Sequence, residues 1–148
     1  MKLEDIKREM DIDSVIDPIK LSEESIRIPI VHNKWIQINC DEKRILKALN
    51  AEFEKLYLIK IEYYSGKAPD QEYIDNPYYV QKIKNLKVLN KDIASYVERD
   101  DEIMSIKSKK DLQEIKVEMV TEFIKGINQR SFNIKNFIEF NKFKNGMN

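Results

Sequence analysis

From Val31 to Tyr64 the sequence contains no glycine or proline, and its apolar side chains recur at steps of three and four residues. This spacing places them on one face of an α-helix. A continuous helix here would be about 50 Å long. That is long for a chain of 148 residues, so we expect part of its apolar face to pack on another subunit. The main row comprises Val31, Trp35, Ile38, Ile45, Leu49, Leu56, Ile59 and Tyr63, and a second row comprises Leu46, Phe53, Tyr57 and Tyr64.

Weaker signals predict further helices before this stretch. Residues 2–10 fit a short amphipathic helix, and Asp17-Pro18 is a typical helix start because Asp accepts from free amides and Pro loses no bond at the first helical position. Residues 26–30 alternate like a strand, but Pro29 fits the first turn of a helix equally well, and we interpret them as helical.

The second half of the chain divides in a similar way. Gly66 is predicted to end the long helix in the left-handed conformation, followed by a loop over 66–77 and a helix over 78–97. A solvated charged break at 99–102 comes next. Ser108 with Asp111 resembles a capping box that starts a last helix, which continues to Phe143. Its predicted core row is Leu112, Ile115, Met119, Val120, Phe123, Ile127, Ile134 and Ile138.

Composition supports an all-α fold. Three glycines and four prolines are too few for the many tight turns of a β-sandwich or barrel, or for a phosphate-binding loop. No apolar run approaches the roughly 18 residues of a transmembrane helix. We therefore expect one helical domain over 1–148, with a long-helix part at 1–66, a loop and connecting helix at 67–101, and a C-terminal oligomerisation helix at 102–148.

The residues that carry chemistry are sparse. Basic and acidic side chains number 26 each, so the global positive field of many nucleic-acid-binding proteins is absent. Cys40 and His32 are too far apart on a helix to form a nucleophile–base pair, and one of each cannot fill a zinc site. The carboxylates lie at helix-surface spacing without an apolar pocket. We expect no catalytic residue, no metal and no cofactor.

Aromatic residues separate into two clusters. Six of the seven tyrosines lie between 57 and 79, beside Lys55, Lys60 and Lys67. Rings beside cations are typical of single-stranded nucleic-acid binding, although spacing alone favours the view that Tyr63 and Tyr64 cover the helix end. Five of the six phenylalanines lie in the last helix, which indicates a core or subunit interface. Arg130, on the apolar row of that helix, is expected to meet a carboxylate of a neighbouring subunit.

Several short segments resemble the UvsY family of recombination mediators from T-even-type bacteriophages. They match in order, without gaps from residue 1 to Gly66. The correspondence returns from about Glu102 to Phe143, and the stretch between differs and is longer here. The matching segments are Met1-Lys2-Leu3-Glu4-Asp5-Ile6, Ile16-Asp17 with Lys20-Leu21, Lys34-Trp35-Ile36, Glu62-Tyr63-Tyr64-Ser65-Gly66, and Arg130-Ser131-Phe132 with Ile134-Lys135.

The resemblance implies a non-enzymatic protein of the host bacterial cytoplasm that binds single-stranded DNA as a six- or sevenfold homo-oligomeric ring. It implies two protein partners, a UvsX-type recombinase and the phage single-strand-binding protein. The family has a basic element before Tyr-Tyr-Ser-Gly; here Leu58 replaces a lysine, while Lys60 keeps the second charge and Lys55 or Lys67 can compensate.

On this basis we select two sets of candidate residues. The candidate DNA contacts are Lys60, Lys55, Lys67, Tyr63, Tyr64, Lys34, Arg44 and Lys47. The candidate oligomer interface comprises Met119, Phe123, Ile127, Arg130, Ile134, Phe137 and Ile138. The main alternative is a helical oligomeric adaptor that binds only proteins, which the zero net charge favours. A metal-dependent enzyme has only scattered carboxylates in its support.

Overall fold

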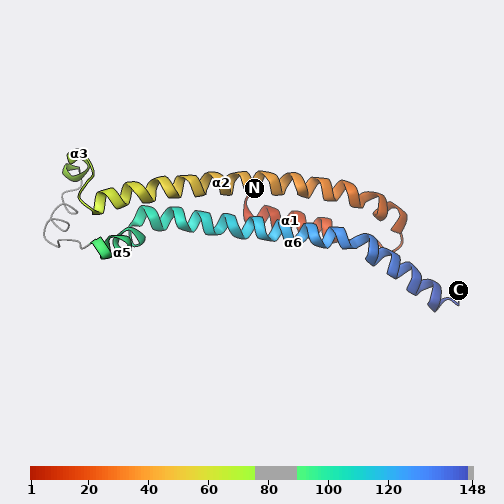
Figure 1. The fold of residues 1–148 in the computed structure, drawn as a ribbon. Helices are drawn as coiled ribbons and strands as arrows, with labels where there is room; N and C mark the ends of the chain where they lie inside the picture. The colour runs from red at the N-terminus through yellow and green to blue at the C-terminus, as the bar shows by residue number, and fades with distance from the viewer. Residues whose placement is uncertain (76–89, 147–148) are drawn as a thin grey trace. The chain divides into compact units, whose positions relative to one another are not determined.

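The computed structural model describes residues 1–75 and 90–146. These residues form helices joined by turns, without a strand among them, which confirms the predicted all-α class (Figure 1). The helices are α1 (Leu3–Ser14), α2 (Leu21–Tyr64), α3 (Asp70–Ile74), the 3-10 helix η1 (Asn90–Asp92), α5 (Ile93–Glu98) and α6 (Asp101–Lys144). Most of the helix predicted over 78–97 lies outside the described residues, and its described end is η1 and α5.

Both ends of α2 are defined by local hydrogen bonds. The predicted start at Asp17-Pro18 is wrong, because Asp17 instead closes a turn: its Oδ1 accepts from the Ile19 N–H at 2.9 Å, and its carbonyl accepts from the Lys20 N–H at 3.2 Å. The helix then begins at Leu21 and includes Pro29. At the other end Gly66 has a φ of 78°, as predicted. Its N–H donates to the Tyr63 carbonyl, and that of Lys67 to the Glu62 carbonyl, which is a Schellman cap.

The start of α6 differs from the prediction. Asp100 caps the helix, since its Oδ1 accepts from the backbone N–H groups of Glu102 at 3.0 Å and Ile103 at 3.4 Å. Ser108 lies inside the helix and donates to the Met104 carbonyl. The capping box at Ser108 was therefore wrong, because Asp100 satisfies the free amides earlier in the chain. The expected solvated break was wrong at the same residue, which is only 7% exposed.

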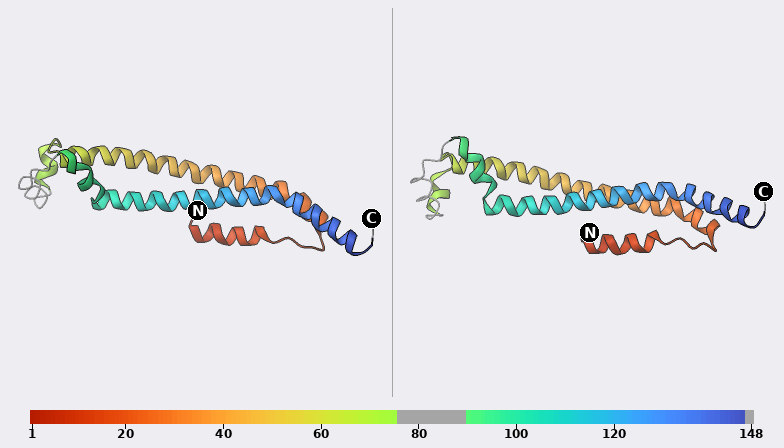
Figure 2. Two further views of the ribbon diagram at one scale, coloured as in Figure 1. Left: turned by 60° about the horizontal axis from the view of Figure 1, so that its bottom comes forward. Right: turned by 90° about the horizontal axis from the view of Figure 1, so that it is seen from below.

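The chain divides into two compact units, the first comprising 1–45 with 113–148 and the second 46–112. In the first unit, α1 runs beside α6 and the early part of α2 (Figure 2). The rings of Trp35 and Phe123 pack edge to face with centroids 4.7 Å apart. The buried core of this unit comprises Ile6, Val31, Trp35, Val120, Ile124 and Ile127.

Buried polar side chains also join α2 to α6 in the first unit. Glu42 is 2% exposed; its Oε2 accepts from the Gln113 Nε2 at 2.6 Å and lies 3.0 Å from the Lys116 Nζ. Burial alone raises the pKa of Glu42, but the hydrogen bonds that it accepts outweigh this and lower the pKa. Because Gln113 and Lys116 occupy the inward face of α6, the predicted core residues Leu112 and Ile115 lie outside it, 47% and 48% exposed.

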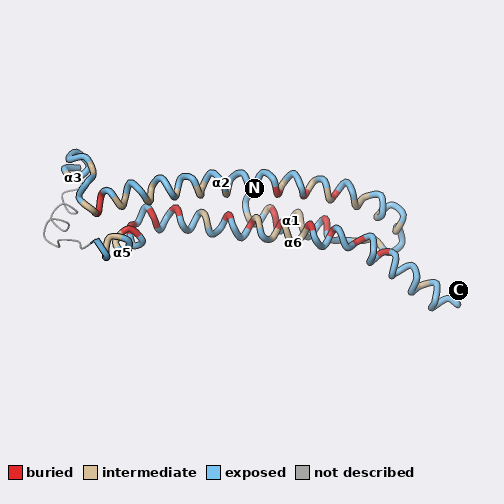
Figure 3. The backbone as a smooth tube through the Cα atoms, viewed as in Figure 1, coloured by how far each residue is buried: buried red, intermediate tan, exposed pale blue. Residues whose placement is uncertain are grey.

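The second unit has its buried core at one end. Tyr63, Tyr64, Val97 and Ile103 form that core. Figure 3 colours buried backbone red beside α5. Between residues 46 and 62, no residue of α2 is fully buried. Leu46, Phe53 and Tyr57 of the second predicted row are half-buried, and so are Leu49 and Leu56 of the main row. Ile59 is 49% exposed, so its place in the predicted core row was wrong; Ile45 of the first unit is likewise 40% exposed.

Candidate nucleic-acid interface

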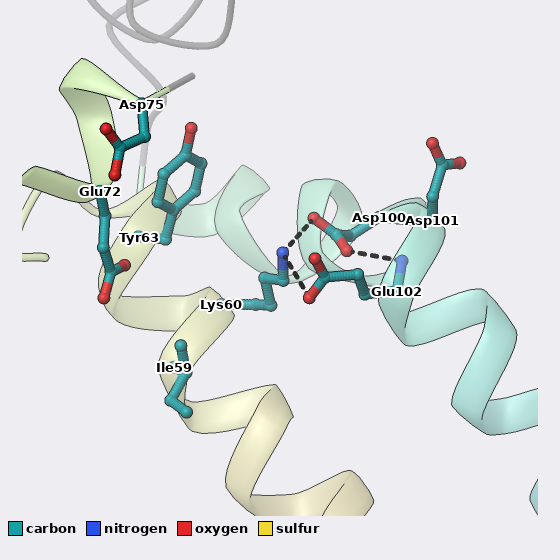
Figure 4. A pocket seen from close by; sticks show the side chains of 8 residues that line it. All are labelled: Ile59, Lys60, Tyr63, Glu72, Asp75, Asp100, Asp101 and Glu102. Atoms are coloured by element: carbon teal, nitrogen blue, oxygen red, sulfur yellow. Dashed lines mark hydrogen bonds and ion pairs between the residues drawn. The ribbon is translucent and has the colours of Figure 1, made fainter.

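A pocket of about 400 Å³ in the second unit contains the first candidate cation, Lys60 (Figure 4). The last turns of α2 provide one wall, and the start of α6 provides another. Among the described residues that line it, five side chains are carboxylates and Lys60 is the only cation. The lining residues are Ile59, Lys60, Tyr63, Glu72, Asp75, Asp100, Asp101 and Glu102.

Lys60 is held by carboxylates of its own chain. Its Nζ lies 3.2 Å from the Asp100 Oδ2 and 3.2 Å from the Glu102 Oε2, and its side chain is 16% exposed. Burial alone lowers the pKa of Lys60, but the hydrogen bonds with Asp100 and Glu102 outweigh this and raise the pKa. Lys60 therefore stays charged, yet a phosphate in this pocket would meet five carboxylates and would have to displace two of them.

The two adjacent tyrosines lie in the core of the second unit. Tyr63 is 8% exposed and Tyr64 is 6% exposed. The Tyr64 hydroxyl donates to the Asp100 Oδ2 at 2.8 Å, and the Tyr73 hydroxyl donates to the Tyr63 carbonyl at 2.6 Å. The Tyr63 ring stacks on Tyr73 with centroids 4.9 Å apart. In this arrangement the two side chains cover the helix end, which is the alternative that spacing alone favours.

The remaining candidate cations differ in whether a carboxylate holds them. The Lys34 Nζ lies 2.7 Å from both the Glu9 Oε2 and the Asp13 Oδ2, and Arg44 lies 3.3 Å from Asp41. In contrast, Lys47, Lys55 and Lys67 are exposed and form no ion pair with a carboxylate in 1–75 or 90–146. These three lysines are the candidates with their charge presented to solvent.

Asp13 is a buried residue that the sequence analysis missed. Its carboxylate accepts from Lys34 at 2.7 Å, from the Trp35 indole N–H at 2.9 Å and from Arg27 at 3.1 Å. Burial alone raises the pKa of Asp13, but the hydrogen bonds from Lys34 and Trp35 outweigh this and lower the pKa. The sequence gave no sign that Asp13 is a buried acceptor, because its three donors all come from α2.

Arg130 also binds within its own chain. A carboxylate partner from a neighbouring subunit stays a prediction; within the chain, the Arg130 Nη2 donates to the backbone carbonyl of Asp13. The carbonyl lies just before the end of α1, where a helix has no amide left to satisfy it. Burial lowers the pKa of Arg130, and Arg27 lowers it further.

The other interface candidates fall into two groups along α6. Ile127 and Ile134 are buried within the chain, and Met119 and Phe123 are half-buried. Toward the C-terminal end, large apolar side chains are exposed: Phe132 65%, Phe137 41%, Ile138 38%, Phe140 62% and Phe143 78%. An apolar pocket of about 160 Å³ adjoins them and is lined by Ile16, Pro18, Leu21, Asn133, Ile134 and Phe137.

Residues 1–75 and 90–146 contain neither a candidate metal centre nor a candidate membrane span. Among them, no group of three or more His, Cys, Asp or Glu side chains has a geometry that could hold a metal ion. Within the same ranges, no helix is both long and apolar enough to cross a membrane.

The geometry alone does not identify the protein family, but comparison with known proteins does. A family model described as "Recombination, repair and ssDNA binding protein UvsY" matches residues 9–147. The recombination protein uvsY of Enterobacteria phage T4 is 26% identical over 93 residues, which cover 63% of this chain and 68% of that protein. Crystal structures of the bacteriophage T4 recombination mediator protein UvsY have the same fold. One superposes with a TM-score of 0.79 at 19% identity, covering 97% of this chain and 99% of that chain. A second lattice also gives 0.79, covering 97% and 98%. Since the family model spans nearly the whole sequence, this chain belongs to the UvsY family.

Proposed function

We propose that this protein is a recombination mediator that binds single-stranded DNA and helps a UvsX-type recombinase assemble on strands coated with single-strand-binding protein. The match of the family model over residues 9–147 is the observation that carries this proposal. The shared fold with the T4 mediator supports it. The protein acts in the host bacterial cytoplasm, and its action is physical rather than catalytic.

Among the candidate DNA contacts, Lys47, Lys55 and Lys67 bind phosphate first. They are exposed and free of carboxylate partners in the described residues, so no ion pair has to break before they neutralise a strand. Lys60 contributes only if Asp100 and Glu102 release it. Tyr63 and Tyr64 would reach a base only after the end of the second unit opens.

The protein assembles as a six- or sevenfold ring through the exposed apolar end of α6. Phe132, Phe140 and Phe143 are each more than half exposed. Aromatic side chains of this size stabilise an assembly when a partner covers them. The strand contacts of one subunit are weak, but copies held in one assembly bind the same strand with much greater avidity. A strand bent along such a ring is a poor lattice for single-strand-binding protein, which leaves a stretch open to the recombinase.

Titration of a labelled single strand at several salt concentrations tests this proposal. For single strands the logarithm of the binding constant falls by about 0.7 per phosphate neutralised for each tenfold rise in salt. Clear salt-dependent binding, together with a light-scattering mass of several chains, supports the mediator. A particle of several chains that ignores DNA supports the alternative, a protein-binding adaptor, which the zero net charge and the paired Lys34, Arg44 and Lys60 favour.

A further inference from the structure

We propose that Lys107, Lys109 and Lys110 of α6 form a phosphate-binding patch for single-stranded DNA, beside the rings of Phe53 and Tyr57 on α2. This inference rests on the proposed function and assigns the strand to residues that the sequence analysis did not select. All five residues belong to the second unit.

The charge along α6 changes sign abruptly within this unit. Residues 98–102 contain four carboxylates and one arginine, whereas residues 103–110 contain three lysines and no carboxylate. The acidic part lines the pocket around Lys60 and repels a phosphate backbone. A strand approaching this unit is therefore drawn away from Lys60 and toward the turn of α6 that contains Lys107, Lys109 and Lys110, called the lysine turn below.

Two of the three lysines, Lys107 and Lys109, are available to a ligand. Lys107 and Lys109 are exposed, and neither forms an ion pair with any carboxylate in the described part of the chain. The Lys110 Nζ lies over the Phe53 ring, 5.0 Å from its centroid. An exposed lysine without an internal partner releases no intramolecular bond when it neutralises a phosphate.

Aromatic rings lie beside this turn. The Phe53 and Tyr57 centroids are 5.8 Å apart at an interplanar angle of 31°, and both side chains are half-buried. They differ in this from Tyr63 and Tyr64, which the core encloses. Cations next to partly exposed rings are the combination that binds single strands without sequence preference, through phosphate contacts and base stacking.

The test measures how strand affinity depends on salt, by fluorescence anisotropy of a labelled single strand. The triple variant K107Q/K109Q/K110Q removes three charges without breaking the helix. Three lost phosphate contacts should reduce the slope of log K against log salt by about 2 per subunit. The matched control K7Q/K20Q/K125Q removes three exposed lysines of the first unit and should keep the wild-type slope. Light scattering and circular dichroism check that both variants keep the wild-type mass and helix content.

Each outcome has a separate meaning. A reduced slope in the first variant alone supports the patch. A wild-type slope in both variants, or an equal loss in both, overturns the patch while the proposed function stands. Wild-type protein that does not bind the strand at any salt concentration contradicts the proposed function itself. A further variant, Tyr57→Leu, should weaken binding severalfold without changing the slope, because it removes stacking and no charge.

Discussion

Replacing Asp13 with alanine should destabilise the first unit by about 3 kcal/mol, because one carboxylate satisfies three donors there. The indole N–H of Trp35, a residue with no exposed surface, would lose its acceptor. An unsatisfied buried donor costs about 1–3 kcal/mol. The side chains of Lys34 and Arg27 are 39% and 36% exposed, so each lost ion pair adds only about 0.5–1 kcal/mol.

Urea unfolding at a fixed protein concentration measures this change, followed by the fluorescence of Trp35, the only tryptophan. Asp13→Asn keeps an acceptor for the indole and should lose only about 1 kcal/mol. The matched control is Asp11→Ala on the same helix, where the side chain is exposed and the effect should stay within about 0.5 kcal/mol. If Asp13→Ala proves as stable as Asp11→Ala, the carboxylate does not hold α1 against α2 and the reasoning fails.

The same residue predicts a dependence on pH. The folded-state pKa of Asp13 is lowered, because the hydrogen bonds from Lys34 and Trp35 outweigh the effect of burial. Its contribution to stability is therefore complete above the unfolded pKa of about 3.9 and is lost as the pH falls through the lower folded value. The stability gap between wild type and Asp13→Asn should narrow when the pH is lowered below about 4. A gap that widens in acid would contradict the assigned direction of the shift.

Three further changes test other parts of the structure. Gly66→Ala should lower the free energy of unfolding by about 1 kcal/mol, because φ is 78° and only the backbone conformation opposes a Cβ; urea unfolding measures this, and no loss would argue against the left-handed cap. Glu42→Ala leaves Lys116 buried without its carboxylate and should cost about 3–5 kcal/mol in the same assay, and a loss below 1 kcal/mol would show that the pair is not buried in solution. Phe143→Asp should reduce the light-scattering mass without reducing helix content, since Phe143 is 78% exposed within one chain, and an unchanged mass would remove it from the subunit interface.

The helical architecture could be predicted from the sequence because its signals are local. An uninterrupted period of three and four residues predicts a long helix, and a glycine after two tyrosines predicts its left-handed end. The start of α6 was misplaced because Asp100 and Ser108 both fit an N-cap locally. The choice depends on the hydrogen bonds that Asp100 accepts from the Tyr64 hydroxyl and from the Glu102 amide. Tyr64 lies far from Asp100 in the sequence, so its contribution could not be predicted locally.

The candidate site was less predictable, because a lysine in a sequence shows its charge but not its partners. Lys60 and Lys55 look alike in the sequence, yet Asp100 and Glu102 hold Lys60 while Lys55 is exposed. The inward positions of Gln113 and Lys116 were missed for a related reason, since polarity predicts exposure unless a buried partner such as Glu42 is known. The sequence shows the lysine turn at 107–110 as a cluster of charge. Only the structure shows that an aromatic ring, that of Phe53, lies beside it.

Assembly of the recombinase on a strand already coated with single-strand-binding protein tests the proposed function most directly. With the recombinase and single-strand-binding protein of the same phage, the lag before filament growth can be followed with and without this protein. We expect the lag to shorten as the wild-type protein is added. The variant K107Q/K109Q/K110Q should shorten the lag less than the wild-type protein does. A lag that stays the same at protein concentrations that saturate the strand would contradict the role of a mediator.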